Sequence, residues 1–375
     1  MMSYKQNSMN DPAASLGGPV GAYPSKHVAP PASHSLPIVP QIFPPSHESA
    51  LIDSFGRIHN NLRISVTDRC NLRCTYCMPE DVVFMDRGEL LTFEEIARFV
   101  EVAAPLGIDK IRLTGGEPLM RREMPRLVCM LARIPGIRDI GLTTNGLLLA
   151  DHAQALYDAG LRRINISLDT LNPERFRQVA RRDGLDRVIE GILAAKRAGF
   201  EPIKINAVSM RGITEEEVVP LGRFARTHGL EMRFIEYMPI GADHWERNKV
   251  YFAHEILEQL EKEIAPLVPV EDYDPRAPAM EFRYTDGGGR VGIIASVSRP
   301  FCASCNRVRL TADGKLRNCL FALDEVDVKQ LLREHAGTAL IADVIRKNVM
   351  AKWEGHEINT ARFIKPIRTM HAIGG

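Results

Sequence analysis

The sequence predicts an α/β fold, in which a parallel β-sheet is covered by helices. From residue 60 onward, six short apolar segments alternate with amphipathic helical segments. The connections between them are short, and several of the helical segments stop at a glycine. Such a sheet can form an open doubly wound sheet or curl into a full or partial barrel. Both arrangements place ligands at the carboxyl ends of the strands.

The individual elements follow from the spacing of apolar residues. The expected strands are 62–67, 110–114, 139–143, 163–168, 202–208 and 232–236. The expected helices are 93–107, 124–134, 153–159, 185–198 and 214–228. The first of these helices has Ile96 and Val100 on one face, and the last is expected to begin with Thr214 as its N-cap and Glu217 completing a capping box.

The regular alternation ends near residue 245, which divides the sequence into two regions. Residues 51–245 contain the strand–helix units, and residues 246–375 form a C-terminal region. This second region combines a helix expected at 254–264, a glycine-rich turn at 286–289 and a helical pattern from 324 to 347. The chain ends in two glycines.

The first 50 residues differ in composition from the rest of the chain. They contain nine of the 24 prolines, only four charged residues and no apolar period. We expect a disordered, proline-rich extension here. A transit peptide would be rich in arginine, but none precedes Arg57, and the apolar core of a secretory signal is also missing.

Composition excludes several classes of protein. The 375 residues carry 48 Lys and Arg against 47 Asp and Glu, and this near-neutral balance argues against a basic nucleic-acid-binding protein. No apolar run approaches the roughly 18 residues of a transmembrane helix, so no membrane partner is expected. Seven cysteines are too few for a disulfide scaffold of this length, and their number is odd.

The positions of the cysteines indicate metal chemistry. Six of the seven form two triplets, Cys70, Cys74 and Cys77 in one and Cys302, Cys305 and Cys319 in the other. Zinc and iron–sulfur sites normally take four protein ligands, so three thiolates leave one metal position open. Structural zinc remains an alternative, above all for the second triplet, because C-x2-C also occurs in zinc ribbons. The seventh, Cys129, lies among apolar residues and is expected to be a small core residue.

The first triplet, with its C-x3-C-x2-C spacing, resembles the cluster loop of radical S-adenosylmethionine (SAM) enzymes. The resemblance implies a [4Fe–4S] cluster on the three cysteines, with SAM bound to the fourth iron and cleaved to a 5′-deoxyadenosyl radical. The Gly-Gly-Glu-Pro segment at 115–118 resembles the part of these enzymes that holds the methionyl amino group, and the carboxylate of Glu117 could accept an ammonium. The contacts to SAM implied by the resemblance are Tyr76, Gly116, Ser167 and Met238.

A set of basic residues on the expected strands indicates an anionic ligand. Arg307 and Arg309 are two positions apart and point the same way if the segment is extended. Arg63, Arg112 and Lys204 lie within apolar strand patterns, where a charged side chain needs an anionic partner or an exit to solvent. Guanidinium groups match phosphate oxygens, so together these residues predict a polyphosphate site.

The two triplets, the basic residues and the Gly-Gly end together resemble the GTP 3′,8-cyclase family, from about residue 55 to the end. This resemblance implies a partial (βα)6 TIM-like barrel whose open side is closed by the C-terminal region. It also implies a second [4Fe–4S] cluster on Cys302, Cys305 and Cys319, with the guanine of GTP at its open iron and the Gly-Gly tail inside the active site. The implied GTP contacts are Arg63, Arg112, Thr143, Lys204, Arg307 and Arg309, the last two also being the catalytic residues.

The activity implied by this resemblance is a lyase reaction, radical cyclisation of GTP to (8S)-3′,8-cyclo-7,8-dihydroguanosine 5′-triphosphate, the first step of molybdenum cofactor biosynthesis. It implies an external electron donor and transfer of the product to cyclic pyranopterin monophosphate synthase, and it allows a homodimer. Labile clusters and free thiolates indicate a reducing compartment, most simply the cytoplasm. Two alternatives stay open, a peptide-modifying radical SAM maturase and a non-catalytic zinc or iron–sulfur protein that binds nucleotides.

Overall fold

The structure is a computed structural model that describes residues 50–241, 243–271 and 274–374. All of these residues lie within one compact unit, Ile42–Gly375. The expected N-terminal extension, residues 1–50, falls outside the described residues except for its last position. Within the described ranges, no helix has the length and apolar character needed to cross a membrane.

The described strands form one sheet, in the order β12-β11-β10-β1-β2-β3-β4-β5-β6-β9-β8-β7. Strands β1 to β6 are parallel and adjacent in chain order, which confirms the expected α/β sheet. The strands are β1 Asn61–Ser65, β2 Lys110–Thr114, β3 Asp139–Thr144, β4 Arg163–Ser167, β5 Ile203–Ser209, β6 Glu231–Glu236, β7 Leu267–Pro269, β8 Met280–Tyr284, β9 Arg290–Ile294, β10 Arg307–Leu310, β11 Lys315–Arg317 and β12 Val326–Asp327.

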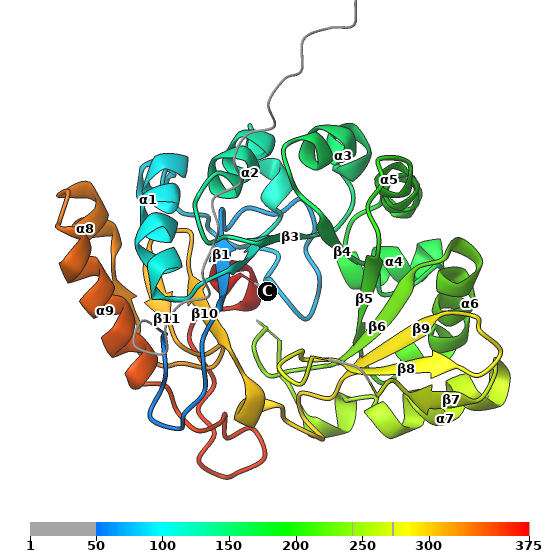
Figure 1. Cartoon of the computed structure of the whole chain (residues 1–375). Coiled ribbons are helices and arrows are strands. Elements are labelled where there is room, and N and C mark those ends of the chain that lie inside the picture. The colour runs from blue at the N-terminus through cyan, green and yellow to red at the C-terminus, as the bar shows by residue number, and fades with distance from the viewer. Residues whose placement is uncertain (1–49, 242, 272–273, 375) are drawn as a thin grey trace, which may run out of the picture. The chain divides into compact units, whose positions relative to one another are not determined.

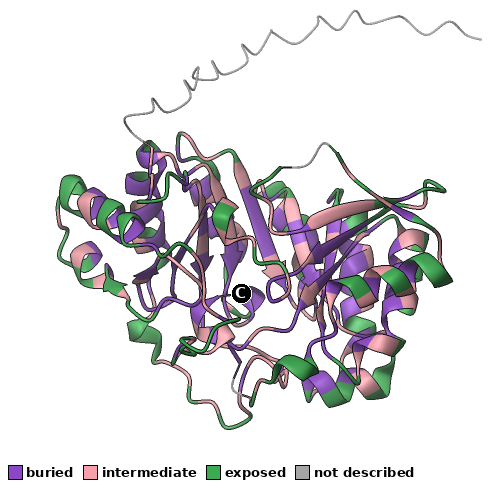
Figure 2. Cartoon of the chain, turned by 90° about the horizontal axis from the view of Figure 1, so that it is seen from below, coloured by how far each residue is buried: buried purple, intermediate pink, exposed green. Residues whose placement is uncertain are grey.

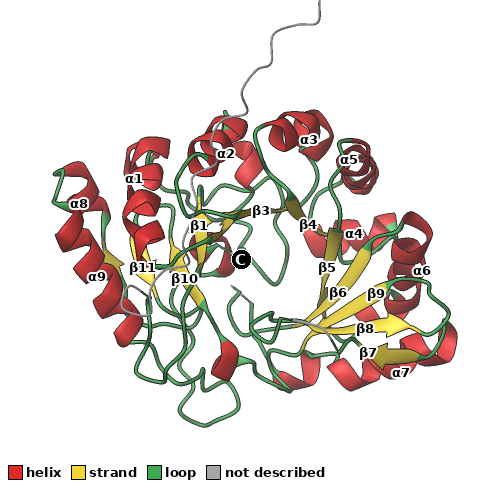
Figure 3. Ribbon diagram, in the orientation of Figure 1, coloured by secondary structure: helices red, strands yellow, loops and turns green. Residues whose placement is uncertain are grey.

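The strands curve into an arc, and the helices that follow them pack on its outer side (Figure 1). This is the partial barrel that the sequence led us to expect, and Figure 3 shows the same two layers of helix and strand. The helices are α1 Phe93–Ala103, α2 Met124–Ala132, α3 Leu149–Asp158, α4 Pro173–Ala180, α5 Leu185–Arg197, α6 Val218–His228, α7 Ala253–Glu263, α8 Lys329–Arg333, α9 Thr338–Met350 and α10 Met370–Ile373.

The twofold alternation of the strands separates the apolar core from the polar interior of the arc. In β5, Ile203 and Ile205 are buried in the main apolar core, which also includes residues of α5. Lys204 and Asn206, which alternate with them, face the opposite side and line the central cavity. Figure 2 shows this buried layer running along the strands and the inner faces of the helices. The polar positions of the strands are therefore held on a rigid wall around the cavity.

The C-terminal region extends the sheet at both edges of the six-stranded arc. Strand β10 pairs in parallel with β1, and β9 pairs in parallel with β6. Strands from both sides of the expected division at residue 245 therefore belong to one sheet. One consequence is that β10, with its two arginines, lies directly beside β1, which leads into the first cysteine triplet.

The predicted capping box of α6 is wrong. Thr214 lies in a short 3₁₀ helix, and its hydroxyl accepts a hydrogen bond of 2.8 Å from the backbone N–H of Met210. The Glu217 carboxylate accepts a 3.0 Å hydrogen bond from the backbone N–H of Leu171 instead of closing the helix end. Thr214 is thus engaged by the turn before it and Glu217 by a distant segment, and a reciprocal capping box is found instead at α1.

Two further elements differ from the expectation. Helix α4 was not expected from the sequence; the side chain of its N-cap, Asn172, accepts a 2.9 Å hydrogen bond from the backbone N–H of Glu174. The helical pattern expected from 324 to 347 is divided among β12, α8 and α9. Strand β12 pairs in antiparallel fashion with β11, so sheet pairing takes up the first residues of the pattern that was expected to be helical.

Candidate active site

A cavity of about 440 Å³ lies on the inner side of the arc and is lined by both the barrel strands and the C-terminal region. It brings together most of the residues expected to form the site. These are Arg63, Tyr76, Arg112, Thr143, Lys204, Met238, Cys302, Cys305, Arg307, Arg309 and Cys319. The expected site residues that do not line it are Cys70, Cys74, Cys77, Gly116 and Ser167. The cavity thus contains the second triplet and reaches the first through Tyr76.

Three arginines on adjacent strands line this cavity and form what we call the arginine row. Arg309 of β10, Arg63 of β1 and Arg112 of β2 are in register on adjacent strands. Among the described residues, none of them has a carboxylate within ion-pair distance. This is an unusual concentration of positive charge, because like charges in a site of low polarity repel one another.

The environment of the row lowers the pKa of each guanidinium. Burial together with the neighbouring Arg309 holds the pKa of Arg63 well below its ordinary value. Burial and the charge of Arg163 lower the pKa of Arg112 to about 10, and burial and Arg307 lower that of Arg309 to about 9. A bound polyanion would offset this repulsion.

Arg307 belongs to the same strand as Arg309 but lies beside the second triplet. Its guanidinium stacks over the ring of Phe301, 4.6 Å from the centroid. Burial opposes ionisation of the nearby Cys305 thiol, but the charges of Arg307 and Lys352 outweigh it and lower the pKa of Cys305 to about 6. Arg307 therefore links the basic part of the cavity to the thiolates of the second triplet.

Lys204 and Thr143 also line the cavity, but neither adds an unpaired positive charge to it. The ammonium of Lys204 forms an ion pair of 2.9 Å with Glu231, so its charge already has a partner. Burial nevertheless lowers the pKa of Lys204. Thr143 of β3 is in register with Asn165 of β4, which also lines the cavity. An anion that uses Lys204 would share it with the carboxylate of Glu231.

Two cavity residues on the barrel strands were missed by the sequence analysis. Arg163 of β4 and Arg233 of β6 both line the cavity. Each is paired, Arg163 with Asp139 and Arg233 with Glu281 at 2.9 Å. The alternation that identified Arg63 and Arg112 applies equally to these positions, so it could have found them. Their pairing depends on neighbouring strands and has no signal in the local sequence.

The first triplet lies in the loop after β1, and backbone and side-chain contacts hold this loop in place. The backbone N–H of Arg73 donates a 2.9 Å hydrogen bond to the carbonyl of Ala180, at the end of α4. The amide of Asn145 lies 3.7 Å from the Cys70 sulfur and donates a 2.7 Å hydrogen bond to Asn71. The loop after β3 therefore holds the cysteine loop through the side chain of Asn145.

The thiols of the first triplet are crowded together in a site of low polarity. Burial raises the pKa of Cys70 to about 11, and burial together with Cys70 raises that of Cys77 to about 12. Burial, Asp169 and the other two thiols raise the pKa of Cys74 well above its ordinary value. Binding of a positively charged metal core would remove this penalty on the thiolates.

The donor chemistry of both triplets fits an iron–sulfur cluster. In each triplet the three thiols lie close enough to affect one another's ionisation. A [4Fe–4S] cluster takes each thiolate on a different iron, so three thiolates would hold it and leave one iron open in each triplet.

Tyr76 and Gly116 have defined structural partners next to the first triplet. The Tyr76 hydroxyl donates a 2.7 Å hydrogen bond to Asp169, whose other oxygen accepts one of 2.8 Å from the backbone N–H of Val208. At Gly116 a Cβ atom would lie 2.3 Å from the carbonyl oxygen of Arg69, so only glycine permits the cysteine loop to pack against β2. Their contacts to SAM stay a prediction.

Two other residues expected near SAM occupy different surroundings. Ser167 ends β4 and is in register with Asn206 of β5, which lines the cavity. Met238 follows β6, lines the cavity, and packs against a small apolar cluster that includes Ile240 and Phe321. Met238 thus both lines the cavity and packs into an apolar cluster. Contact with SAM stays a prediction for Ser167 and Met238.

Glu117 does not offer a free carboxylate to an ammonium, contrary to the expectation from its motif. The side chain is fully buried, and its two oxygens accept hydrogen bonds from the Leu119 and Asn145 backbone N–H groups at 3.0 and 2.7 Å. The Thr144 hydroxyl donates a third, also 2.7 Å long. Glu117 therefore ties the turn after β2 to the loop after β3.

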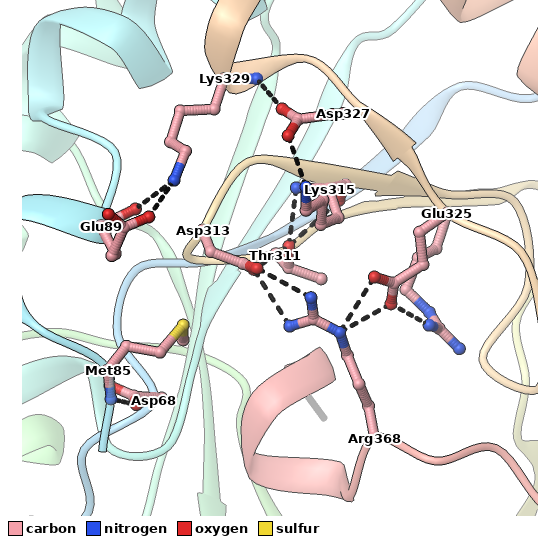
Figure 4. Close-up of polar contacts among 11 residues, drawn as sticks. Asp68, Met85, Glu89, Thr311, Asp313, Lys315, Glu325, Asp327, Lys329 and Arg368 are labelled. Carbon is pink, nitrogen blue, oxygen red and sulfur yellow. Dashed lines mark hydrogen bonds and ion pairs between the residues drawn. The ribbon is translucent and has the colours of Figure 1, made fainter.

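The C-terminal segment enters the arc of strands (Figure 1), and Arg368 anchors it there (Figure 4). Arg368 forms two hydrogen bonds with Asp313, of 3.1 and 2.7 Å, and a third of 3.0 Å with Glu325. Farther along, the backbone of His371 lies beside the Cys77 thiol. The carbonyl oxygen of Gly374 then accepts a hydrogen bond of 2.5 Å from Arg309. Gly375 lies outside the described residues, so the described tail reaches the arginine row with its last residue.

Comparison with known proteins identifies relatives of both regions of the chain. Residues 64–225 match the radical SAM superfamily, and residues 230–358 match the family described as Molybdenum Cofactor Synthesis C. The GTP 3′,8-cyclase of Rhodopirellula baltica is 48% identical over 331 residues, which cover 87% of this chain and 92% of that protein. The enzyme of the same name from Thermodesulfovibrio yellowstonii is 45% identical over 325 residues, covering 86% and 99%.

A solved structure with a similar fold comes from a more distant protein. Streptococcus suis SuiB aligns with a TM-score of 0.55 over 78% of this chain and 69% of its own, at 15% sequence identity. At that identity the likeness concerns the fold alone, and it agrees with the partial barrel seen here.

Proposed function

The chain belongs to the GTP 3′,8-cyclase family of the radical SAM superfamily, and we propose that GTP is bound and cyclised in the cavity that contains the second cysteine triplet and reaches the first through Tyr76. The reaction is the conversion of GTP to (8S)-3′,8-cyclo-7,8-dihydroguanosine 5′-triphosphate, the first step of molybdenum cofactor biosynthesis. The observation that carries the assignment is the row of Arg309, Arg63 and Arg112 without carboxylate partners among the described residues.

The cofactors follow from the two triplets. Cys70, Cys74 and Cys77 would hold one [4Fe–4S] cluster together with SAM, and the second triplet would hold another. When bound, the first cluster and SAM supply the 5′-deoxyadenosyl radical that removes the C3′ hydrogen of GTP and so leads to the bond between C3′ and C8. The protein contributes the binding and orientation of the reacting groups.

The arginines bind the charged part of the substrate. The row on β10, β1 and β2 faces the triphosphate and ribose, and Arg307 holds the substrate near the second triplet. Each charge-assisted hydrogen bond contributes about 1.5–3 kcal/mol, so a few of them suffice for tight binding. Thr143 and Lys204 complete the set of GTP contacts, with Lys204 shared between GTP and Glu231.

The contacts to SAM come from the strand ends beside the first triplet. We assign Tyr76, Gly116, Ser167 and Met238 to this role. The hydrogen bond of 2.7 Å from Tyr76 to Asp169 supports it, because it fixes the aromatic ring at the junction of the triplet and the cavity. The C-terminal segment, which lies between Cys77 and Arg309, would exclude water from the reacting groups.

The proposal extends to partners that act before and after the reaction. An external electron donor would reduce the first cluster, and the product would pass to cyclic pyranopterin monophosphate synthase. The reaction would take place in the cytoplasm, where thiolates and clusters stay reduced. The chain would assemble as a homodimer, and the mass of the native protein tests this.

The decisive experiment is an anaerobic assay of the cluster-loaded chain with SAM, GTP and a reductant. We expect 5′-deoxyadenosine and the cyclised nucleotide in equal amounts. A peptide-modifying enzyme would not bind GTP, and a zinc or scaffold protein would not cleave SAM. Formation of 5′-deoxyadenosine without consumption of GTP would contradict the proposed substrate.

A further inference from the structure

A buried lysine outside the cavity makes direct contact with the second triplet. Lys352 follows α9 and is 4% exposed. Its ammonium donates a hydrogen bond of 2.8 Å to the carbonyl oxygen of Arg307 and one of 3.4 Å to the sulfur of Cys305. Lys352 does not line the cavity, so it is not placed to touch a nucleotide bound there.

The ammonium of Lys352 has no carboxylate partner among the described residues. A buried charge is costly unless it is paired, and such groups normally have a counter-ion within a few ångströms. The anionic group in direct contact with the ammonium is the thiolate of Cys305, whose sulfur lies 3.4 Å from the Lys352 nitrogen. Lys352 therefore has the second triplet as its counter-ion.

A neighbouring cation shows what distinguishes Lys352. Arg57 also reaches this loop, and its guanidinium donates to the carbonyl oxygens of Cys302, Trp353 and Glu354 at 2.8, 2.6 and 2.6 Å. Its charge is balanced by Asp53 at 2.6 Å. Arg57 therefore stabilises the backbone of the loop, whereas Lys352, which has no carboxylate partner among the described residues, directs its positive charge at the sulfur of Cys305.

We propose that Lys352 is a positioning residue of the second cluster, whose ammonium hydrogen-bonds the Cys305 ligand and keeps the reduction potential of the cluster higher than it would otherwise be. Reduction adds one negative charge to a group that is already anionic through its thiolates. A cation in contact with one of them stabilises the reduced state more than the oxidised state. Hydrogen bonds to the sulfurs are a recognised determinant of cluster potentials.

The inference rests on the proposed assignment of Cys302, Cys305 and Cys319 as cluster ligands, and the experiment tests the two separately. The full chain is prepared with Cys70, Cys74 and Cys77 replaced by alanine, so that only the second cluster contributes. Iron and sulfide analysis of this chain tests the ligand assignment. A reductive titration followed by electron paramagnetic resonance then measures the midpoint potential. A chain that binds no iron would overturn the assignment and this inference with it.

In that chain, Lys352→Met should lower the midpoint potential by at least 59 mV, a tenfold change in the reduction equilibrium for one electron. Lys352→Arg, which keeps the charge, should stay close to the parent value. Lys347→Met is the matched control, because Lys347 lies on α9 with its side chain 77% exposed and paired with Asp343. An iron-loaded Lys352→Met chain with the parent potential would overturn the role of Lys352 alone.

A second neutral variant covers the case in which Lys352→Met fails to hold its cluster. Lys352→Gln keeps a hydrogen-bond donor but loses the charge, and it should also lower the potential. Loss of iron from both neutral variants, with full iron in Lys352→Arg, would mean that Lys352 is needed to assemble the site and would overturn its role in setting the potential.

Discussion

Arg309 donates a hydrogen bond to the carbonyl oxygen of Gly374, across 2.5 Å and 65 positions of sequence. The end of the chain therefore lies at the arginine row, in the interior of the arc. In the same segment, the backbone of His371 contacts the Cys77 thiol. The segment therefore extends from the first triplet to the arginine row. A phosphate that binds Arg309 would compete with the Gly374 carbonyl for the same guanidinium.

We predict that alanine at Cys70, Cys74 or Cys77 abolishes formation of 5′-deoxyadenosine. Each thiolate occupies one iron, and two remaining ligands do not hold a cluster that reduces SAM. The measurement is anaerobic turnover with SAM and dithionite, with iron analysis alongside. Cys129→Ala serves as the control, because Cys129 belongs to neither triplet and lies in α2. Residual 5′-deoxyadenosine in any of the three triplet variants would contradict the proposed chemistry.

Replacement of Arg307 or Arg309 by alanine should weaken GTP binding while leaving both clusters intact. Loss of one charge-assisted hydrogen bond costs about 1.5–3 kcal/mol, which corresponds to roughly a 10- to 150-fold higher Kd. Equilibrium binding of GTP to the cluster-loaded chain checks this. Arg346→Ala is a suitable control, since Arg346 is exposed on α9. Normal GTP affinity in both variants would show that the site is wrongly assigned.

Arg368→Gln should release the C-terminal segment from its anchor. The substitution removes the charged hydrogen bonds to Asp313 and Glu325, while both carboxylates keep other partners, Thr311 and Arg317 respectively. We expect faster hydrogen exchange at residues 369–374 and reduced turnover. Arg368→Lys should restore part of both.

The control for this experiment is Arg362→Gln, because Arg362 is 79% exposed and pairs only with Glu357 among the described residues. If exchange at 369–374 is unchanged in Arg368→Gln, the segment is held by its later contacts, and Arg368 is not its anchor.

The pH dependence of stability should contain a contribution from His59. This side chain is fully buried, and burial together with the charge of Lys352 lowers its pKa to about 4. The unfolded chain, with an ordinary pKa near 6.5, takes up the proton first. Stability from His59 is therefore fully present above pH 6.5 and is lost by about 1.4 kcal/mol per pH unit as the pH falls toward 4.

Anaerobic denaturant titrations at about pH 7 and pH 5.5 measure this contribution. His59→Gln should unfold with a smaller dependence on pH than the parent chain, whereas His254→Gln should not differ, because His254 is exposed. An equal loss of stability on acidification in the parent and in His59→Gln would show that another group is responsible.

Much of the fold could be predicted because its signals are local. The six barrel strands appear within two residues of the expected positions, since apolar alternation and terminal glycines are properties of short segments. The two triplets and the five basic residues were found in the same way. Capping was less predictable: Thr214 and Glu217 have the right identities and spacing for a capping box, yet each bonds to a partner outside the helix.

The sequence by itself determined the kinds of chemical group that this protein carries, namely two incomplete sets of thiolate ligands and a set of cations on strands of a parallel sheet. Only the tertiary structure decided which of those groups act together. It placed β10 beside β1, which aligned Arg309 with Arg63, and it paired Lys204 with Glu231. It also brought Lys352 to Cys305. The physical reason is that strand register and charge pairing depend on how distant segments pack, whereas spacing along the chain reports only on neighbours in sequence.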